Sequence, residues 1–400
     1  MLTGNGLWMF CIFVKSTKVV FFATYIFPIF ERKILKRTLL IATLVIIGPQ
    51  GFSQVVKYAN AFLDIGVGAR NLGMSGAVCA ANNDVTSGYW NPAGLVNMDR
   101  DLQITFMHNE HFAGIVKYDY GAVAYKFNEN SAGAFTFIRS GVDDIPNTLE
   151  LVDANGNVNY DKVTGFNAAD YAFQFTYSRS IPKLKGFTYG GSIKVLYRHI
   201  GQFGNGWGFG FDFGVKYKLK TWTFAGMLRD ATGTITNFSY NTEVFRLVFT
   251  ATGNDIISSS TEIATPRLVL GTSKKFNLPK KFGILTEIDI ATTFDGRRNV
   301  LIPAGPMSFD PMWGVEFEYN DLVFIRGGVG KFQYLKAPGD KKEINLLPTI
   351  GIGFKYKGVS IDYTLANFAS QMVGLSHVIS ARLDLFTKKK PTTENVPVVQ

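Results

Sequence analysis

Closely spaced histidines are the first residues whose chemistry must be tested, because two imidazoles can share a metal ion. The chain contains four histidines, and only His108 and His111 lie near each other, in the segment His108-Asn109-Glu110-His111. Zinc-binding motifs of this kind need helical spacing, which puts both imidazoles on one face. This segment follows a predicted strand and is expected at a turn. We therefore predict an ordinary polar rim and no metal site.

A second candidate is the segment from Asp153 to Asp161, in which oxygen-bearing side chains alternate as in a calcium loop. The EF-hand pattern needs glycine at its sixth position and a late glutamate. Here the sixth position is Val158, and no glutamate follows at the right place. The pair Asn155-Gly156 is typical of a hairpin turn. We favour a turn at the tip of a long loop; the alternative is a calcium ion that orders this surface loop.

Catalytic motifs are not evident. Alternate glycines at Gly204, Gly206, Gly208 and Gly210 superficially resemble a phosphate loop, but no Lys-Ser or Lys-Thr pair closes the motif. We interpret them as small inward-facing or turn residues. No nucleophile elbow is present. The prediction is a protein that is not an enzyme and that needs no cofactor.

Strands are the elements that would position these side chains. Between Trp207 and Leu219 the residue types alternate without a break, which puts successive side chains on opposite faces of a strand. One face is apolar and aromatic, with Trp207, Phe209, Phe211, Phe213, Val215, Tyr217 and Leu219. The other face is small or charged, with Gly208, Gly210, Asp212, Gly214, Lys216 and Lys218. Similar segments begin at Tyr171, Phe282, Trp313 and Ile350.

Charges on the second face narrow the fold class. Glu287, Asp289, Glu316, Glu318, Lys216 and Lys218 could not all lie in a dry sandwich core without partners. They fit the outer face of a sandwich or the wet lumen of a barrel. Repetition of the pattern along most of the chain favours an all-β, transmembrane antiparallel β-barrel. The content of charged residues agrees, because 18% is below the roughly 25% of soluble domains.

Residues 1–53 are predicted to be a leader. A basic pair, Lys36-Arg37, an apolar run over 39–48 and small residues at 51–53 form a signal peptide over 35–53. The apolar segment 1–34 is interpreted as a start site assigned too far upstream; the alternative is a true membrane anchor. Without the leader the net charge falls from +10 to +5, and Cys79 is the only cysteine left. No basic patch interleaved with aromatic residues predicts a nucleic-acid partner.

Three parts follow the leader. Residues 54–100 are rich in Gly and Ala and show little alternation, and residues 101–386 contain about 14 predicted strands. Residues 387–400 form a Lys-rich tail, predicted to be periplasmic, which is either mobile or in contact with a partner. Short turns are predicted at 220–221 and 320–321. Long loops, expected to face outward from the cell, are predicted at 140–167, 230–262, 295–310 and 334–345.

The segment before the strands carries a family resemblance. It reads Phe62-Leu63-Asp64-Ile65-Gly66-Val67-Gly68-Ala69-Arg70-Asn71-Leu72-Gly73-Met74-Ser75-Gly76-Ala77 and continues through Asn83-Asp84-Val85 to Tyr89-Trp90-Asn91-Pro92-Ala93-Gly94-Leu95. It resembles the PorV/PorQ family of outer-membrane proteins and, more distantly, the long-chain fatty-acid transporter (FadL-type) superfamily. The resemblance implies a 14-stranded barrel in the outer membrane of a Gram-negative cell. It also implies that the N-terminal segment folds inside the lumen as a hatch.

Particular residues would build that hatch. Small residues let its backbone pack against a crowded lumen wall, and inward-facing charges of the strands gain hydrogen-bond partners from its backbone. The alternative is a plain Gly-rich loop before the barrel. The hatch motif residues are Gly66, Gly68, Arg70, Gly73, Gly76, Asp84, Trp90, Asn91, Pro92 and Gly94.

Two functions compete. The PorV/PorQ resemblance implies a component or partner of the type IX protein secretion system, which would bind a translocon or cargo protein through its long loops. Aromatic residues there, Phe238, Tyr240, Phe245 and Phe249, are possible contacts, unless they pack onto the barrel rim. The alternative is a transporter of small hydrophobic molecules, with an apolar pocket lined by hatch residues such as Phe62, Leu63 and Met74. Besides outer-membrane lipid, the expected partners are thus proteins or a hydrophobic ligand.

Overall fold

The computed structural model describes residues 60–153, 155–336, 342–366 and 375–385. The predicted leader (1–53), the first residues of the predicted hatch and the predicted tail (387–400) lie outside the described residues. Four short helices precede the first strand: η1 (Ala61–Ile65), α2 (Ala69–Gly73), α3 (Ser87–Trp90) and η2 (Pro92–Asn97). In the part of the chain that is described, no helix is long and apolar enough to cross a membrane.

The rest of the described chain is almost entirely strand. The first half contains β1 (Leu102–His111), β2 (Val116–Asn128), β3 (Ser131–Asn147), η3 (Tyr160–Lys162), β4 (Thr164–Ser180), β5 (Phe187–Ile200), β6 (Gly204–Leu219), β7 (Trp222–Arg229) and β8 (Thr234–Tyr240). The second half contains α4 (Thr242–Thr252), β9 (Ser259–Ala264), β10 (Arg267–Asn277), η4 (Pro279–Lys281), β11 (Phe282–Thr293), β12 (Ile302–Ala304), β13 (Met307–Tyr319), β14 (Val323–Lys336), β15 (Lys342–Tyr356), β16 (Val359–Ala366) and β17 (Ser376–Leu385).

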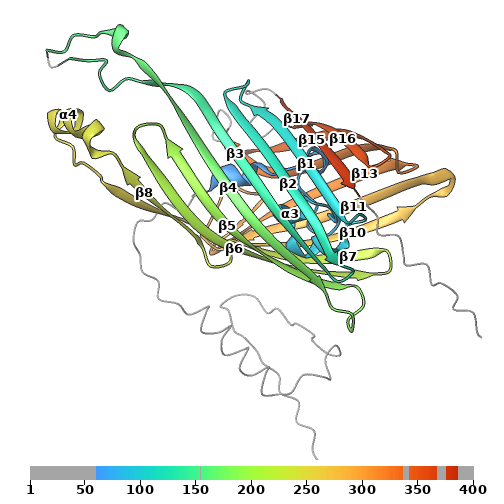
Figure 1. Cartoon of the computed structure of the whole chain (residues 1–400). Helices are drawn as coiled ribbons and strands as arrows, with labels where there is room; N and C mark the ends of the chain where they lie inside the picture. Colours follow the sequence, from blue (N-terminus) through green and yellow to red (C-terminus); the bar gives the residue numbers. More distant parts are fainter. Residues whose placement is uncertain (1–59, 154, 337–341, 367–374, 386–400) are drawn as a thin grey trace, which may run out of the picture. The chain divides into compact units, whose positions relative to one another are not determined.

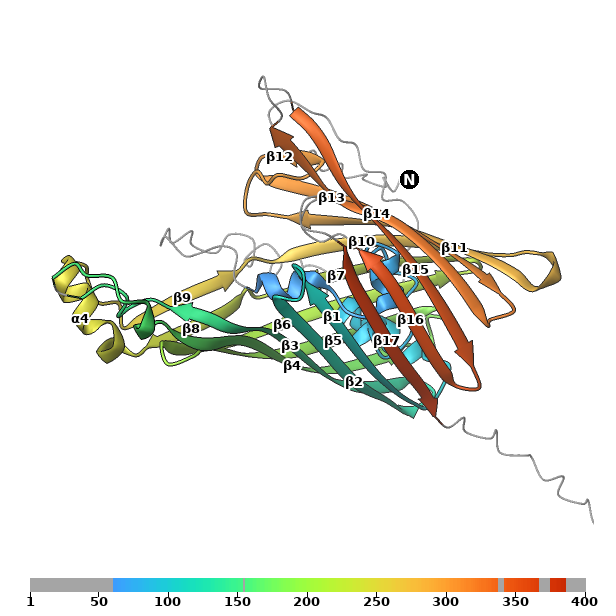
Figure 2. The ribbon, with the colours of Figure 1, turned by 90° about the horizontal axis from the view of Figure 1, so that it is seen from above.

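These strands form one closed antiparallel barrel. Most strands pair with their neighbours in the chain, and β17 pairs with β1, so the sheet closes on itself. Both β7 and β8 pair with β6, so together they occupy one position in the wall. Likewise β10 pairs with β7 and β9 pairs with β8, so β9 and β10 together occupy the next position. With the short β12 beside β13, the wall has 14 positions, as predicted. Figures 1 and 2 show the strands arranged around the barrel. Because the sheet is closed, the backbone N–H and C=O groups of its strands find partners within the wall, as a hydrocarbon environment requires.

The wall has one apolar face and one polar face. In β6, Trp207, Phe209 and Phe213 are exposed outward, whereas Asp212 and Lys216 are buried inside. Exposed aromatic side chains also cluster at the end of the barrel that has short turns, and this set contains Tyr125, Phe127, Tyr177, Tyr189, Tyr217, Trp222, Phe282, Tyr319 and Tyr356. An apolar band bounded by an aromatic girdle is typical of barrels that cross a bilayer. The parity predicted from the sequence is therefore confirmed.

Several predicted loops are shorter than expected because strands extend into them. The hairpin of β3 and β4 reduces the loop predicted at 140–167 to residues 148–163, and the region predicted as a loop at 230–262 contains β8, α4 and β9. The prediction that His108-Asn109-Glu110-His111 forms a turn is wrong. These residues end β1, where His111 is buried and His108 is exposed on the opposite face. Among the described residues no cluster could hold a metal ion.

Asp153 lies at a turn in the loop between β3 and β4. Its carboxylate accepts hydrogen bonds from the backbone N–H groups of Asn155 and Asn157 and from the side chain of Asn157, at 2.8–3.0 Å. These local bonds lower the pKa of Asp153. They occupy the carboxylate that the calcium alternative would have used, so the turn interpretation explains this segment.

Candidate functional site

The N-terminal segment of residues 60–100, which we call the hatch segment, contacts inward-facing side chains of the wall. Its helices are short and its backbone turns sharply, with positive φ at Gly66, Gly68 and Gly76. At Gly66 and Gly76 an added Cβ would lie about 3 Å from the Trp90 ring. Asn91 begins η2 and accepts a hydrogen bond from the Ala93 N–H at 3.1 Å, as an N-cap residue does.

Two carboxylates on β11 hold one turn of the hatch segment. Asp289 accepts hydrogen bonds from the N–H groups of Val78 and Cys79, both at 2.9 Å. Glu287 accepts from the N–H groups of Ala80 and Ala81, at 2.5 and 2.8 Å. Four consecutive backbone donors, which no helix or sheet satisfies here, thus find carboxyl oxygens of the wall as acceptors. Inward-facing carboxyl groups of the strands therefore gain partners from the backbone of this segment.

A network of charges fixes α2 to the neighbouring part of the wall, beginning at β13, which pairs with β11. The Arg70 guanidinium donates to Glu316 of β13 with two hydrogen bonds of 2.9 Å. Glu316 also accepts a 2.6 Å bond from Arg326 of β14, which in turn donates to Asp362 of β16 at 2.6 Å. Glu316 and Arg326 are buried. The bidentate geometry sets both the position and the orientation of Arg70.

Further polar contacts hold the middle of the hatch segment. Arg382 of β17 donates to Asp84 at 2.6 Å, and Lys216 of β6 donates to the Asn82 carbonyl at 2.6 Å. Burial opposes ionisation of Asp84, but Arg382 and then Arg70 outweigh it, so the pKa of Asp84 lies below its usual value. Burial, reinforced by Asp289, raises the pKa of the Cys79 thiol well above its usual value.

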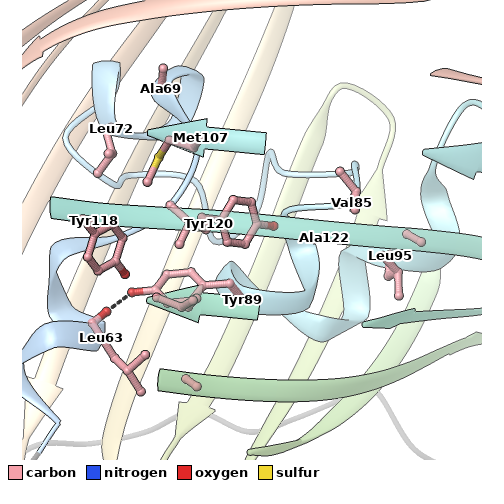
Figure 3. Packing of buried hydrophobic residues seen from close by; sticks show 14 of the residues in the cluster. Leu63, Ala69, Leu72, Val85, Tyr89, Leu95, Met107, Tyr118, Tyr120 and Ala122 are labelled. Atoms are coloured by element: carbon pink, nitrogen blue, oxygen red, sulfur yellow. Dashed lines mark hydrogen bonds between the residues drawn. The ribbon is translucent and has the colours of Figure 1, made fainter. Parts of the chain in front are cut away.

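Aromatic and charged groups fix the beginning of the hatch segment. The Tyr89 hydroxyl donates to the Leu63 carbonyl (Figure 3). Arg229, at the end of β7, donates to the Tyr89 hydroxyl at 3.1 Å and to its carbonyl at 3.0 Å. Arg267, at the start of β10, pairs with Asp64 at 2.8 Å. Burial opposes ionisation of Asp64, but Arg267 prevails and lowers its pKa.

A cavity of about 310 Å³ lies against the hatch segment on the side of the long loops. Its lining combines apolar groups with charged ones, among them Ile65, Leu72, Trp90, Val269, Met312, Leu347, Arg229, Arg267, Asp289, Asp310 and Lys331. The pocket residues expected from the sequence are not those of the lining. Phe62, Leu63 and Met74 are buried in packing contacts, because the short helices turn them away from this cavity.

A second cavity, of about 720 Å³, lies on the side of the short turns. It is mainly polar, and its lining includes Arg70, Asn83, Asp84 and Val96 of the hatch segment. The two cavities share no lining residue. The hatch segment therefore separates them.

A third charged cluster lies between β7 and β8, and the sequence did not indicate it. Lys194 of β5 contacts Asp212 of β6 at 2.8 Å and Asp230 at 2.6 Å, and all three side chains are buried. Asp230 has a φ of 51° and also accepts from Thr234. These contacts stabilise the interruption of the strand. The alternating pattern placed Asp212 inside, but Asp230 fell in a predicted loop.

The aromatic residues predicted to contact partners lie on the loop side. Phe238 of β8 is buried, with the Arg198 guanidinium over its ring. On α4, Phe245 contacts Phe249 and also packs on Phe203. Tyr240 stacks on Phe238. Packing onto the rim thus accounts for Phe238, and partner binding by the other three remains a prediction.

Comparison with solved structures matches this barrel to transporters. The CymD monoaromatic hydrocarbon channel aligns over 81% of this chain and 99% of its own, with 12% identity and a TM-score of 0.51. The Ralstonia pickettii toluene transporter TbuX aligns over 80% and 99%, with 13% identity and a TM-score of 0.51. The fold is a 14-stranded antiparallel barrel like that of these proteins.

A third match extends this result. The Pseudomonas putida toluene transporter TodX covers 79% of this chain and 96% of its own, with 11% identity and a TM-score of 0.50. No protein-family model matches the chain, and no curated protein matches it. The FadL-type resemblance of the sequence agrees with the fold, whereas the narrower PorV/PorQ resemblance rests on the hatch motif alone.

Proposed function

We propose that this chain is an outer-membrane barrel that binds small hydrophobic molecules in its lumen and passes them across the membrane when the hatch segment moves. The observation that carries the proposal is the cavity of about 310 Å³ between the hatch segment and the wall. Its volume is at the lower end of the range for ligand sites, about 300–1,000 Å³. It suits one aromatic ring or a short chain. The named functions of the matched barrels, hydrocarbon channel and toluene transporter, support the same substrate class.

Movement of the hatch segment is a necessary part of this proposal. A ligand in the loop-side cavity reaches the turn-side cavity only if the segment shifts, since the two share no lining residue. The segment is held by hydrogen bonds and ion pairs with the wall and also by apolar packing, in which residues such as Leu72, Tyr89 and Leu95 contact buried side chains of the wall (Figure 3). The polar contacts can exchange for contacts with water in a wet lumen, which lowers the cost of local opening, whereas the apolar packing opposes it.

A disulfide that locks the hatch segment tests the proposal. The hydroxyl oxygens of Ser75 and Thr349 lie 3.3 Å apart, so the pair Ser75→Cys and Thr349→Cys is placed for a disulfide between hatch and wall. The background carries Cys79→Ala, which removes the only other cysteine of the mature chain. We expect uptake of radiolabelled toluene into proteoliposomes to stop on oxidation and to return after reduction.

A matched control separates locking from oxidation itself. The pair Asn237→Cys and Thr261→Cys joins two wall strands at paired positions, β8 and β9, and leaves the hatch segment free. Uptake through this control should not depend on redox state. Uptake that persists through the oxidised Ser75–Thr349 pair would refute a moving hatch, and the absence of protein-dependent toluene uptake would refute the substrate class.

A second function, binding of secretion-system proteins as the PorV/PorQ resemblance implies, is supported by one feature. The ends of β3 and β4 and the arm formed by β8, α4 and β9 extend on the loop side, where α4 packs near the wall through Phe203 (Figure 1). Projecting elements of this kind often carry recognition. Replacing residues 242–252 by a short Gly-Ser linker should abolish co-purification of a secretion component from the outer membrane. Unchanged co-purification, or none with the intact chain, would count against this function.

A further inference from the structure

The charged groups around the loop-side cavity are mostly committed to partners within the protein. Arg267 pairs with Asp64, Arg229 binds Tyr89, and Arg298 pairs with Asp295, whereas Asp289 uses only Oδ2 for its two bonds to the hatch segment. A ligand that needed one of these arginines would have to displace an existing contact. The selectivity of the cavity must therefore come from groups whose hydrogen-bonding capacity is not yet used.

Asp310 is such a group. It lies near the loop-side end of β13, and its carboxylate lines the cavity. The Oδ1 atom of Asp310 is shielded from solvent and accepts no hydrogen bond from any described residue. Leaving a buried acceptor unpaired costs about 1–3 kcal/mol, and more for a charged group. A bound molecule that donates a hydrogen bond to this oxygen would remove the penalty.

The cavity also has a direction. Asp310 and Ser308 are near the loop-side start of β13, whereas Met312 lies deeper, on the same side as Trp90 of the hatch segment, since both lie beside Gly76. An amphipathic molecule therefore fits with its apolar part against the hatch segment and its polar group toward the long loops. This is the usual arrangement of a ligand site, in which a few polar groups fix orientation.

The surrounding charges restrict the polar group further. Arg267, Arg298 and Lys331 line the same cavity, so a protonated amine would meet like charges. A carboxylate would be attracted by these cations but has no proton to donate to Oδ1 and would be repelled by Asp310, and a pure hydrocarbon would leave Oδ1 without a donor. A neutral hydroxyl avoids all three penalties.

We propose that the cavity prefers small hydrophobic molecules that carry a hydroxyl group, phenols or short alcohols, which donate a hydrogen bond to Asp310. This inference rests on the proposed function and narrows its substrate class. A hydrogen bond to a charged acceptor is worth about tenfold or more in affinity. The hydroxyl should also orient the ligand, so that its apolar end contacts Leu72 and Trp90.

The test uses four probes of one shape: 4-methylphenol, toluene, 4-methylanisole and 4-methylbenzoate. Binding to the processed full chain in nanodiscs is measured by calorimetry, with the heat of partition into empty nanodiscs subtracted. We expect 4-methylphenol to bind about tenfold more tightly than toluene or 4-methylanisole, which lack a donor. Asp310→Val should reduce this ratio to near one and leave toluene binding unchanged. Asp310→Asn, which keeps an acceptor oxygen, should give an intermediate ratio and guards against misfolding of the valine variant.

A control variant and the relative affinities of the four probes separate the hydroxyl preference from the proposed function. Asp143→Asn changes an aspartate of β3 that does not line the cavity, and it should leave all affinities unchanged. Equal binding of 4-methylphenol and toluene would overturn the hydroxyl preference while leaving hydrocarbon binding intact. Tightest binding of 4-methylbenzoate would overturn it in favour of acids. If none of the four probes bound, the proposed function would fall together with the inference.

Discussion

The pair of Arg70 and Glu316 should determine how readily the hatch segment opens, and replacing the carboxylate tests this. In Glu316→Gln the side chain keeps its size, but the charge that binds two guanidinium groups is lost. Arg70 then lies near Arg326 with one fewer neighbouring carboxylate. Removing one partner of a buried ion pair costs about 3–5 kcal/mol. The bond between Glu316 and Arg326 lies within the wall and is present whether the hatch segment is closed or open. Its share of this free energy therefore does not affect opening.

About 3 kcal/mol of the penalty should therefore fall on the closed hatch segment. Since 1.4 kcal/mol corresponds to a factor of ten, the open population should rise about 100-fold. Cys79 reports this opening directly, because its thiol is buried in the hatch segment and is the only one after residue 53. The labelling rate of Cys79 with a maleimide, measured in nanodiscs where closing outpaces labelling, should rise by the same factor.

Two controls make the experiment decisive. Glu318→Gln is the same substitution two residues further along β13, but Glu318 pairs with Lys275 at the rim and not with the hatch segment. Its labelling rate should match that of the unmodified chain. In a background of Arg70→Met, Glu316→Gln should add little, because the bond across the hatch is already missing. A change of less than threefold for Glu316→Gln alone, or full additivity of the two substitutions, would refute the assignment.

Three further predictions address packing, pH and the membrane face. Gly328→Ala places a Cβ 2.4 Å from the Met74 backbone, so it should destabilise the closed hatch segment by about 1–3 kcal/mol and speed Cys79 labelling. The lowered pKa of Asp84 means that its pairing with Arg382 stabilises the hatch segment at pH values above the usual aspartate pKa. That contribution is lost as the pH falls through the lower folded-state pKa, so hydrogen exchange of the segment should accelerate only below about pH 4, and Arg382→Gln should weaken this pH dependence and leave the smaller contribution of Arg70. Phe213→Lys puts a charge on the outward face and should lower the unfolding free energy in bilayers by about 2–4 kcal/mol, as measured in urea titrations; a value near zero would argue against a lipid-facing position.

The wall and the hatch segment are held by different kinds of contact, which is why opening of the segment and unfolding of the barrel should respond to different substitutions. The wall is a continuous ladder of backbone hydrogen bonds closed by β1 and β17, and its unfolding must break the whole ring. The hatch segment has no such ladder with the wall. It is held by hydrogen bonds and ion pairs at separate points, among them the carboxylates of Glu287 and Asp289, and by apolar packing on the wall. Loss of one contact should therefore open the segment without unfolding the barrel.

Much of the barrel could be predicted from the sequence. The alternation from Trp207 to Leu219 gave the correct inward and outward faces, because the period of a strand is a local property of the backbone. The inward charges Glu287 and Asp289 implied polar partners, because a buried charge without one is too costly. The lengths of β3 and β4 were underestimated, since strands that rise beyond the membrane lose the apolar alternation that marks them.

The sequence by itself determined which side of each strand faces hydrocarbon and that the interior must be polar, because these follow from residue spacing and the energy of burying charge. Only the tertiary structure decided which charges meet. Arg70 and Glu316 are 246 positions apart, and their contact depends on closure of the barrel and on the turns of the hatch segment. For the same reason the residues predicted to line the cavity, Phe62 and Met74, differ from those that do line it, such as Ile65 and Leu72. Short helices of four to six residues carry no periodic signal strong enough to show which side faces the lumen.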